Sequence, residues 1–213
     1  MAQDLLIPGL LAAAWPAERP RIRQLMESPY GTWLLQAYSA LDTSLLYCSG
    51  IHGQGHIERV MLLGAMVAQG LSLPAADTEV LLFCCSYHDI GRVNDWLDDC
   101  HGGRSAELLL QPALKERLAA FTETEIRVMQ AVIAAHSLYD GAMEKTGDAY
   151  EVGEDQRGRY LLLARCLKDA DNLDRVRLGD LDVRYLRCDV SRSLAEEAEW
   201  IYRAYLRVKE ARQ

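Results

Sequence analysis

A histidine and an aspartate, His88 and Asp89, stand next to each other shortly after an apolar run over residues 80–85, with Ser86 and Tyr87 between. An imidazole nitrogen beside a carboxylate oxygen suits Zn, Fe, Mn or Ni, and the carboxylate is free to bridge a second ion. Adjacent residues on a helix point about 100° apart, so both side chains can converge on one ion only where the helix ends. We expect Gly91 to let the chain turn away there. The pair therefore indicates a metal site at the end of a helix.

Other residues of metal-binding type fall at the ends of other apolar segments. His56 stands at the head of one segment, His136 ends another, His101 follows one loop after Asp89, and Asp171 closes a later segment. Each alone has a simpler explanation, because a helix C-terminus favours a histidine and acidic residues are common in solvated turns. Helical bundles, however, build metal sites from side chains on facing helices. Their recurrence at successive helix ends therefore favours one shared site.

Helical periodicity predicts the elements that would position these side chains. Apolar residues recur at helical spacing over residues 57–71, and Pro74 begins a second helix that runs to His88. Residues 160–168 form another strongly apolar helical segment. We find no alternating β-branched runs and no internal repeat. The sequence therefore predicts an all-α fold.

Two capping boxes and one long loop complete the expected elements. Thr122 with Glu125 precedes a periodic segment, and Ser193 with Glu196 precedes the last one. Residues 140–156 are glycine-rich, acidic and aperiodic. Long loops in compact domains are usually lids or disordered segments. We therefore expect residues 140–156 to be a loop that shapes the pocket.

The length of 213 residues fits one domain with an N-terminal extension. Residues 1–50 read as helical pieces with a break around Pro16–Pro20, and we expect them to form a helical extension packed on the core. An interaction arm is the alternative, and the aromatic stretch at 33–38 leaves a homodimer interface open. Residues 51–213 are then the metal-binding helical domain.

Composition limits the class of partner. The net charge of −8 disfavours a nucleic-acid surface and an anionic membrane. The six cysteines form no C-x-x-C pair, so free thiols in a reducing compartment are expected. No segment is long and apolar enough to span a bilayer, and the first residues lack the basic start of a secretory signal. These features predict a cytoplasmic protein without a membrane partner.

The chain resembles the HD-domain metal-dependent phosphohydrolases from about residue 52 to residue 178. The resemblance rests on His56 in an H-x-x-R-V context, on the His88–Asp89 pair followed by Ile-Gly-Arg, and on Asp171 in an A-D-x-L-D context. It implies an HD-domain helical bundle in which these four residues bind one divalent metal. His101 in its H-G-x-x-S-A setting and His136 match the extra histidines of members with a second metal, which Asp89 would bridge.

The resemblance also implies a chemistry. One or two divalent transition metals (Mn, Fe, Co, Ni or Zn) would provide a metal-activated hydroxide that attacks a phosphoester. The substrate would be a nucleotide or another small phosphorylated metabolite. Arg92 and Arg104 would neutralise the phosphoryl oxygens, with Arg59 and Arg175 as weaker candidates. The catalytic candidates also include Asp95, as a proton donor or water-orienting group, and His52, which would touch the substrate or cap the turn before His56.

Two other functions remain open at this point. A few relatives with this ligand set use two irons to activate O₂, so a diiron oxygenase acting on a small polar substrate is one alternative. A non-catalytic module that binds a nucleotide is the other. It is disfavoured because no core ligand is missing. In Arg92 the sequence departs from a position where lysine is common, and His52 is a second histidine ahead of His56.

Overall fold

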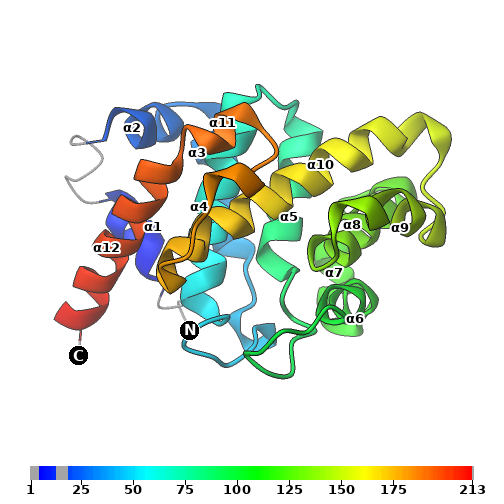
Figure 1. Ribbon diagram of the computed structural model, residues 1–213, viewed down its shortest axis with the longest axis horizontal. Coiled ribbons are helices and arrows are strands. Elements are labelled where there is room, and N and C mark those ends of the chain that lie inside the picture. Colours follow the sequence, from blue (N-terminus) through cyan, green and yellow to red (C-terminus); the bar gives the residue numbers. More distant parts are fainter. Residues whose placement is uncertain (1–4, 13–18, 213) are drawn as a thin grey trace.

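The computed structural model describes residues 5–12 and 19–212. Helices and turns make up this part of the chain, and it contains no β-strand, which confirms the predicted all-α class (Figure 1). Of the expected break around Pro16–Pro20, Pro16 lies outside the described residues, whereas Pro20 begins a helix. None of the helices in the described ranges has the length and apolar character needed to cross a membrane.

Four helices form the centre of the fold. They are α4 (Gln54–Gly70), α5 (Ala75–Tyr87), α8 (Glu123–His136) and α10 (Glu154–Leu173). Helix α4 is buried on every side from His56 to Ala68, as expected for a helix that is apolar around its whole circumference from Val60 onward. Helix α10 packs against α4, α5 and α8, and in Figure 1 it runs across α4 and α5. A shorter helix, α6 (His101–Leu108), packs on α8.

Three N-terminal helices precede this core and contact α4. They are α1 (Leu6–Ala12), α2 (Pro20–Met26) and α3 (Pro29–Ala40). The buried carboxylate of Glu58 in α4 accepts hydrogen bonds from the backbone N–H groups of Leu6 and Ile7, each at 2.7 Å. Glu58 thus satisfies two N–H groups at the start of α1, which a helix cannot bond internally. The division at residue 50 stays a prediction.

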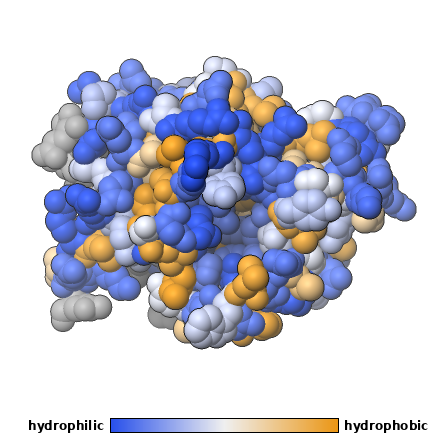
Figure 2. All heavy atoms as spheres, viewed as in Figure 1, coloured by the Kyte–Doolittle hydropathy of each residue, from blue (hydrophilic) through white to orange (hydrophobic). Residues whose placement is uncertain are grey.

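The last long helix, α12 (Ala195–Ala211), packs against α1, α4 and the turn that follows α10. Hydrophilic residues cover most of the face drawn in Figure 2, and hydrophobic residues lie among them in small groups.

The remaining elements are short: η2 (Thr43–Leu45), η3 (Pro112–Leu114), α7 (Lys115–Leu118), η4 (Asp140–Ala142), α9 (Met143–Ala149), η5 (Asp174–Leu178), η6 (Val183–Tyr185) and α11 (Asp189–Arg192).

The prediction of a long loop over residues 140–156 is wrong. This segment contains η4 and α9, and α10 already begins at Glu154. Tertiary contacts stabilise it where local periodicity is missing. The hydroxyl of Tyr160 donates to the carbonyl of Met143 at 2.7 Å, and a Cβ atom at Gly147 would lie only 2.9 Å from the Tyr160 ring. The glycine that suggested a loop is therefore a close-packing position between two helices.

One of the two predicted capping boxes is present. Thr122 and Glu125 form it at the start of α8. The box predicted at Ser193 is wrong, because α12 begins two residues later and Leu194 occupies its N-cap. The Ser193 hydroxyl instead donates to the carbonyl of Val190 at the end of α11. All six cysteines are free, as predicted.

Candidate metal centre

Four of the six predicted ligands meet around His56. His56 lies in the first turn of α4, His88 and Asp89 directly follow α5, and Asp171 lies in the last turn of α10. The Nε2 atom of His56 is 3.3 Å from Nε2 of His88, 3.6 Å from Oδ2 of Asp89 and 3.3 Å from Oδ1 of Asp171. Three separate helix ends therefore bring two imidazoles and two carboxylates to one point, which we call the first ligand group.

The other two predicted ligands lie on the opposite side of Asp89. His101, the first residue of α6, and His136, the last of α8, place their Nε2 atoms 2.8 Å apart. These atoms are 3.1 Å and 3.6 Å from Oδ1 of Asp89. We call Asp89, His101 and His136 the second ligand group. The two oxygens of Asp89 thus face different groups, as a bridging carboxylate requires.

The outward ring nitrogens of three histidines contact the backbone. The Nδ1 atom of His88 lies 3.0 Å, and that of His136 2.6 Å, from the carbonyl oxygen three residues earlier in the chain. His101 makes the same contact. A carbonyl only accepts hydrogen bonds, so each Nδ1 carries the proton and each Nε2 keeps its lone pair for a metal. Partners of this kind orient metal-binding histidines.

His56 has a carboxylate as its partner instead. Its Nδ1 lies 2.8 Å from Oδ2 of Asp174, whose two oxygens also accept from Arg59 at 2.6 Å and 2.9 Å. Asp174 was not among the predicted site residues, and Arg59 was only a weaker candidate. Their spacing was a usable signal, because each stands three residues after a ligand, Asp171 and His56, and so lies one helical turn away.

Lys168 is a further buried residue that was not among the predicted site residues. Its Nζ donates to the carbonyls of Ala135 at 3.1 Å and of Leu138, and it lies 3.3 Å from Oδ1 of Asp140. It thereby satisfies carbonyl groups at the C-terminus of α8, where His136 lies. Burial lowers the pKa of this ammonium group.

Burial and charge set the protonation states of the ligands. Burial lowers the pKa of His56 and of His136 to about 4, so both are neutral at neutral pH. Burial alone would raise the pKa of Asp89, but neighbouring histidines outweigh it and hold the pKa well below its usual range. The pKa of Asp171 is lowered in the same way against its burial. Neutral imidazoles and ionised carboxylates are the forms that bind a divalent metal.

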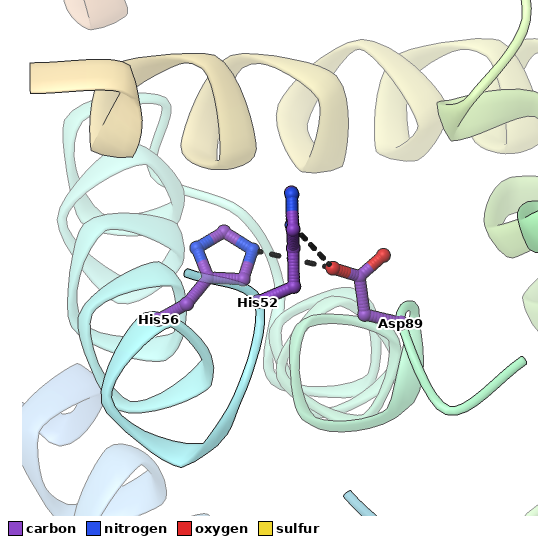
Figure 3. A group of neighbouring side chains, drawn as sticks. All are labelled: His52, His56 and Asp89. Atoms are coloured by element: carbon purple, nitrogen blue, oxygen red, sulfur yellow. Dashed lines mark ion pairs between the residues drawn. The ribbon is translucent and has the colours of Figure 1, made fainter. Parts of the chain in front are cut away.

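The donor set fits one or two divalent transition metals. Imidazole and carboxylate ligands suit several such ions. The Oδ1 atom of Asp89 is buried and has no hydrogen-bond partner within the described part of the chain. A buried carboxylate oxygen without a donor is exceptional, and a bound cation would satisfy it. Three sets of side chains lie close enough together for ligation: His56, His88 and Asp171 from the first group, His88, Asp89 and His136 from both groups, and His52, His56 and Asp89 (Figure 3).

Two of the four predicted catalytic residues lie beside this cluster. His52 points toward Asp89 together with His56 in Figure 3, and its Nδ1 is 3.2 Å from Oδ2 of Asp89. The Nε atom of Arg92 is 3.0 Å from the same oxygen. Both side chains therefore flank the first ligand group.

The structure does not bring the other two to the cluster. Within the described residues, no hydrogen bond or ion pair joins Asp95 to a predicted ligand, and its Oδ1 instead accepts from the Ser49 hydroxyl at 2.5 Å. Arg104 donates from Nε to the carbonyl of Gly91 at 2.8 Å and from Nη2 to Asp98. These contacts hold the turn after Asp89 against the loop before α6. Arg175, a weaker candidate, pairs at the surface with Asp180.

Gly91 was expected to let the chain turn away after Asp89, but the structure gives it a different role. It does not adopt the left-handed conformation that would turn the chain away. A Cβ atom at this position would lie 2.4 Å from the backbone nitrogen of Ser105, and the Gly91 N–H donates to the Ser105 hydroxyl at 2.8 Å. A side chain here would separate α6 from the turn that holds Asp89. The glycine thus allows the second ligand group to assemble.

Comparison with known proteins gives one match. The family model described as HD domain matches residues 54–176. These residues extend from the first turn of α4 into η5 and contain all six predicted ligands, whereas His52 lies just before them. No curated protein and no solved structure matches the chain.

Proposed function

This chain belongs to the HD-domain family, and on that premise we propose that it is a metal-dependent phosphohydrolase. The substrate would be a nucleotide or another small phosphorylated metabolite. The observation that carries the proposal is the division of Asp89, whose two oxygens face two separate histidine-containing ligand groups. An arrangement of this kind suits two-metal hydrolysis of phosphoesters.

The two groups would hold different ions. His56, His88, Asp89 and Asp171 would bind one, and Asp89, His101 and His136 the other. Divalent metals bound there would act as Lewis acids, which acidify water and polarise phosphoryl oxygens. The identity of the metal, among Mn, Fe, Co, Ni and Zn, is a matter for experiment.

The residues beside the centre would act on the substrate directly. Arg92 is held at Oδ2 of Asp89 through its Nε, and its Nη1 lies 3.4 Å from the carbonyl of Trp96. Its remaining donors would bind phosphoryl oxygens and neutralise the charge that develops on them. His52 lies on the same side of Asp89 and can hold or release a proton at an imidazole nitrogen. We propose it as the acid–base group nearest the centre.

Elemental analysis of the purified chain followed by a phosphate-release screen tests this proposal. The screen covers nucleotides and other phosphoesters, each with Mn, Fe, Co or Ni added. We expect bound divalent metal and metal-dependent phosphate release. His88→Ala should lower phosphate release by about 100-fold or more, since even residues that only orient ligands are worth 10–100-fold. The control is Arg203→Gln, which removes an exposed ion pair with Glu199 on α12.

Three results would contradict the proposal. The first is a chain that binds no metal, and the second is full activity in His88→Ala. The third is a metal-loaded chain that releases no phosphate. In that last case, iron content with O₂ consumption on a small polar substrate would favour the oxygenase alternative. Nucleotide binding without turnover would favour the binding module.

A further inference from the structure

A cavity of about 210 Å³ lies next to the first ligand group, between the start of α4, η5 and α12. Figure 1 shows α12 beside α4, and the two helices are in contact. We call this cavity the α4–α12 pocket. His56 lines it, so it adjoins the metal centre. Pockets for whole drug-sized ligands usually measure about 300–1,000 Å³, so this one suits a single polar group of a ligand.

Positive charge dominates its walls. Arg59, Arg177 and Lys209 all line the pocket. The carboxylate of Asp174 pairs with Arg59 at 2.6 Å and lies 3.4 Å from Nη1 of Arg177. Lys209 is exposed and forms no ion pair within the described ranges. The chain as a whole carries a net charge of −8, so this local excess of cations is not a consequence of composition.

Arg177 is buried but incompletely bonded. Its side chain is only 6% exposed, and its Nε atom is buried with no hydrogen-bond partner among the described residues. Its two contacts, to Asp174 and to Nδ1 of His52, are both long at 3.4 Å. A buried guanidinium normally has its donors satisfied. Guanidinium groups bind oxyanions through several of their N–H groups, and Nη1 and Nη2 each have a second N–H from which an anion in the pocket could accept.

Helix α4 adds to the attraction. It begins at Gln54 beside the pocket, and its N-cap, Gly53, offers no side-chain oxygen to the first turn. The N-terminus of a 17-residue helix carries partial positive charge. A Cβ atom at Gly55 would lie 2.1 Å from the Tyr205 hydroxyl, so the glycine leaves room for the Tyr205 side chain of α12 at the start of α4.

We propose that the α4–α12 pocket is a binding site for a phosphate-class oxyanion. The charges attract an anion, the incompletely bonded Arg177 supplies a buried donor, and the size admits one charged group. The anion could come from two sources. One is a second phosphate group of the substrate, in which case the site deepens the proposed function and rests on it. The other is free phosphate, which would bind whether or not the chain is a hydrolase.

Calorimetric titration of inorganic phosphate into the full chain tests for the site. The chain is used as purified and after chelation of its metals, at one mildly alkaline pH. We expect the chelated wild type to bind phosphate. Lys209→Gln should bind it about two- to fivefold more weakly, as for an exposed ion pair. Arg177→Gln should weaken binding by about tenfold or more, as for a buried charged hydrogen bond.

The matched control is Arg207→Gln. It makes the same change of charge on α12, two residues from Lys209, in an exposed side chain that does not line the pocket. It should bind phosphate as the wild type does. A chelated wild-type chain that binds no phosphate would overturn the proposal. So would equal weakening by Lys209→Gln and Arg207→Gln. Lys209 is exposed, so its variant gives this answer even where Arg177→Gln fails to fold.

Kinetics then distinguish the two sources. If the substrate supplies the anion, Lys209→Gln should raise KM about two- to fivefold for compounds with two phosphate groups and leave KM for one-phosphate compounds unchanged. If free phosphate is the ligand, Lys209→Gln should leave both KM values unchanged while still weakening phosphate binding. A chain that hydrolyses no phosphoester would contradict the proposed function alone, because phosphate binding to the chelated chain needs no turnover.

Discussion

His56 and Asp174 are joined by a hydrogen bond of 2.8 Å between Nδ1 and Oδ2. Burial would raise the pKa of Asp174, but the charge of Arg59 and the hydrogen bonds to the carboxylate outweigh it and lower the pKa. An ionised carboxylate only accepts hydrogen bonds, so the proton of His56 sits on Nδ1. The Nε2 lone pair is therefore directed at His88, Asp89 and Asp171. One carboxylate outside the ligand groups thus fixes the tautomer of a ligand.

Asp174→Asn should weaken metal binding. The amide keeps the shape of the carboxylate but loses its charge, so it holds His56 less firmly in the ligating tautomer. We expect metal affinity to fall by about 10–100-fold, measured by competition with a chromophoric chelator. The control is Asp180→Asn, which changes an exposed aspartate paired with Arg175. Equal affinities in Asp174→Asn and the wild type, with thermal unfolding showing both chains folded, would contradict this role.

His101→Ala should remove metal from the second ligand group alone. Its Nε2 is 3.1 Å from Oδ1 of Asp89 and 2.8 Å from Nε2 of His136, whereas the first group gathers around Oδ2. We expect elemental analysis to find about one metal equivalent fewer than in the wild type. His88→Ala should affect the first group instead. An unchanged metal content in His101→Ala would mean that this histidine is not a ligand.

Most of the candidate ligands stand at helix ends that periodicity locates, whereas His101 follows a loop and came from the resemblance to HD-domain proteins. His88, for example, ends an apolar segment, and the structure places it as the C-cap of α5. Thr122 was predictable as a cap for the same reason, since a capping box is a contact between residues three apart. Local spacing carries such features, and the fold only needs to bring the helix ends together.

Features that depend on contacts distant in the chain could not be predicted in this way. Residues 140–156 look like a loop, yet α9 forms because Tyr160 packs against it. Arg104 looked free to bind a phosphoryl group, but the turn after Asp89 takes its Nε donor. Asp174 is 118 residues beyond its partner His56, so local spacing could place it one turn after Asp171 but could not show that it pairs with His56.

Asp95→Asn should leave catalysis nearly intact. Asp95 accepts from the hydroxyl of Ser49, whose oxygen in turn accepts from the backbone N–H groups of Ile51 and His52. Asp95 therefore supports the turn that carries His52 and does not touch the ligand groups. Loss of a general acid typically costs about 10²–10⁴-fold in rate. We expect a change of less than about tenfold and an unshifted pH–rate profile. If Asp95→Asn instead loses one limb of the pH–rate profile, Asp95 is the proton donor after all.

Thr122→Ala should destabilise the fold without touching the metal centre. The Thr122 hydroxyl accepts from the backbone N–H of Glu125 at 3.2 Å and so satisfies an N–H group in the first turn of α8. We expect the free energy of unfolding, measured in urea, to fall by about 1 kcal/mol. Thr124→Ala, at an exposed position of the same turn, is the control and should have a smaller effect. Equal losses in the two variants would show that the cap contributes nothing.

Glu125 should make the stability of the chain depend on pH in acid. The hydrogen bond from the Thr122 N–H, at 3.0 Å, lowers the pKa of the Glu125 carboxylate below its ordinary value of 4.5. The folded-state pKa is lower than the unfolded one, so the ionised carboxylate stabilises the fold above 4.5, and this contribution is lost as the pH falls through the folded-state pKa. The difference in unfolding free energy between the wild type and Glu125→Gln should therefore be constant near neutral pH and shrink in acid. A difference that stays the same at every pH would mean that the charge on Glu125 does not contribute.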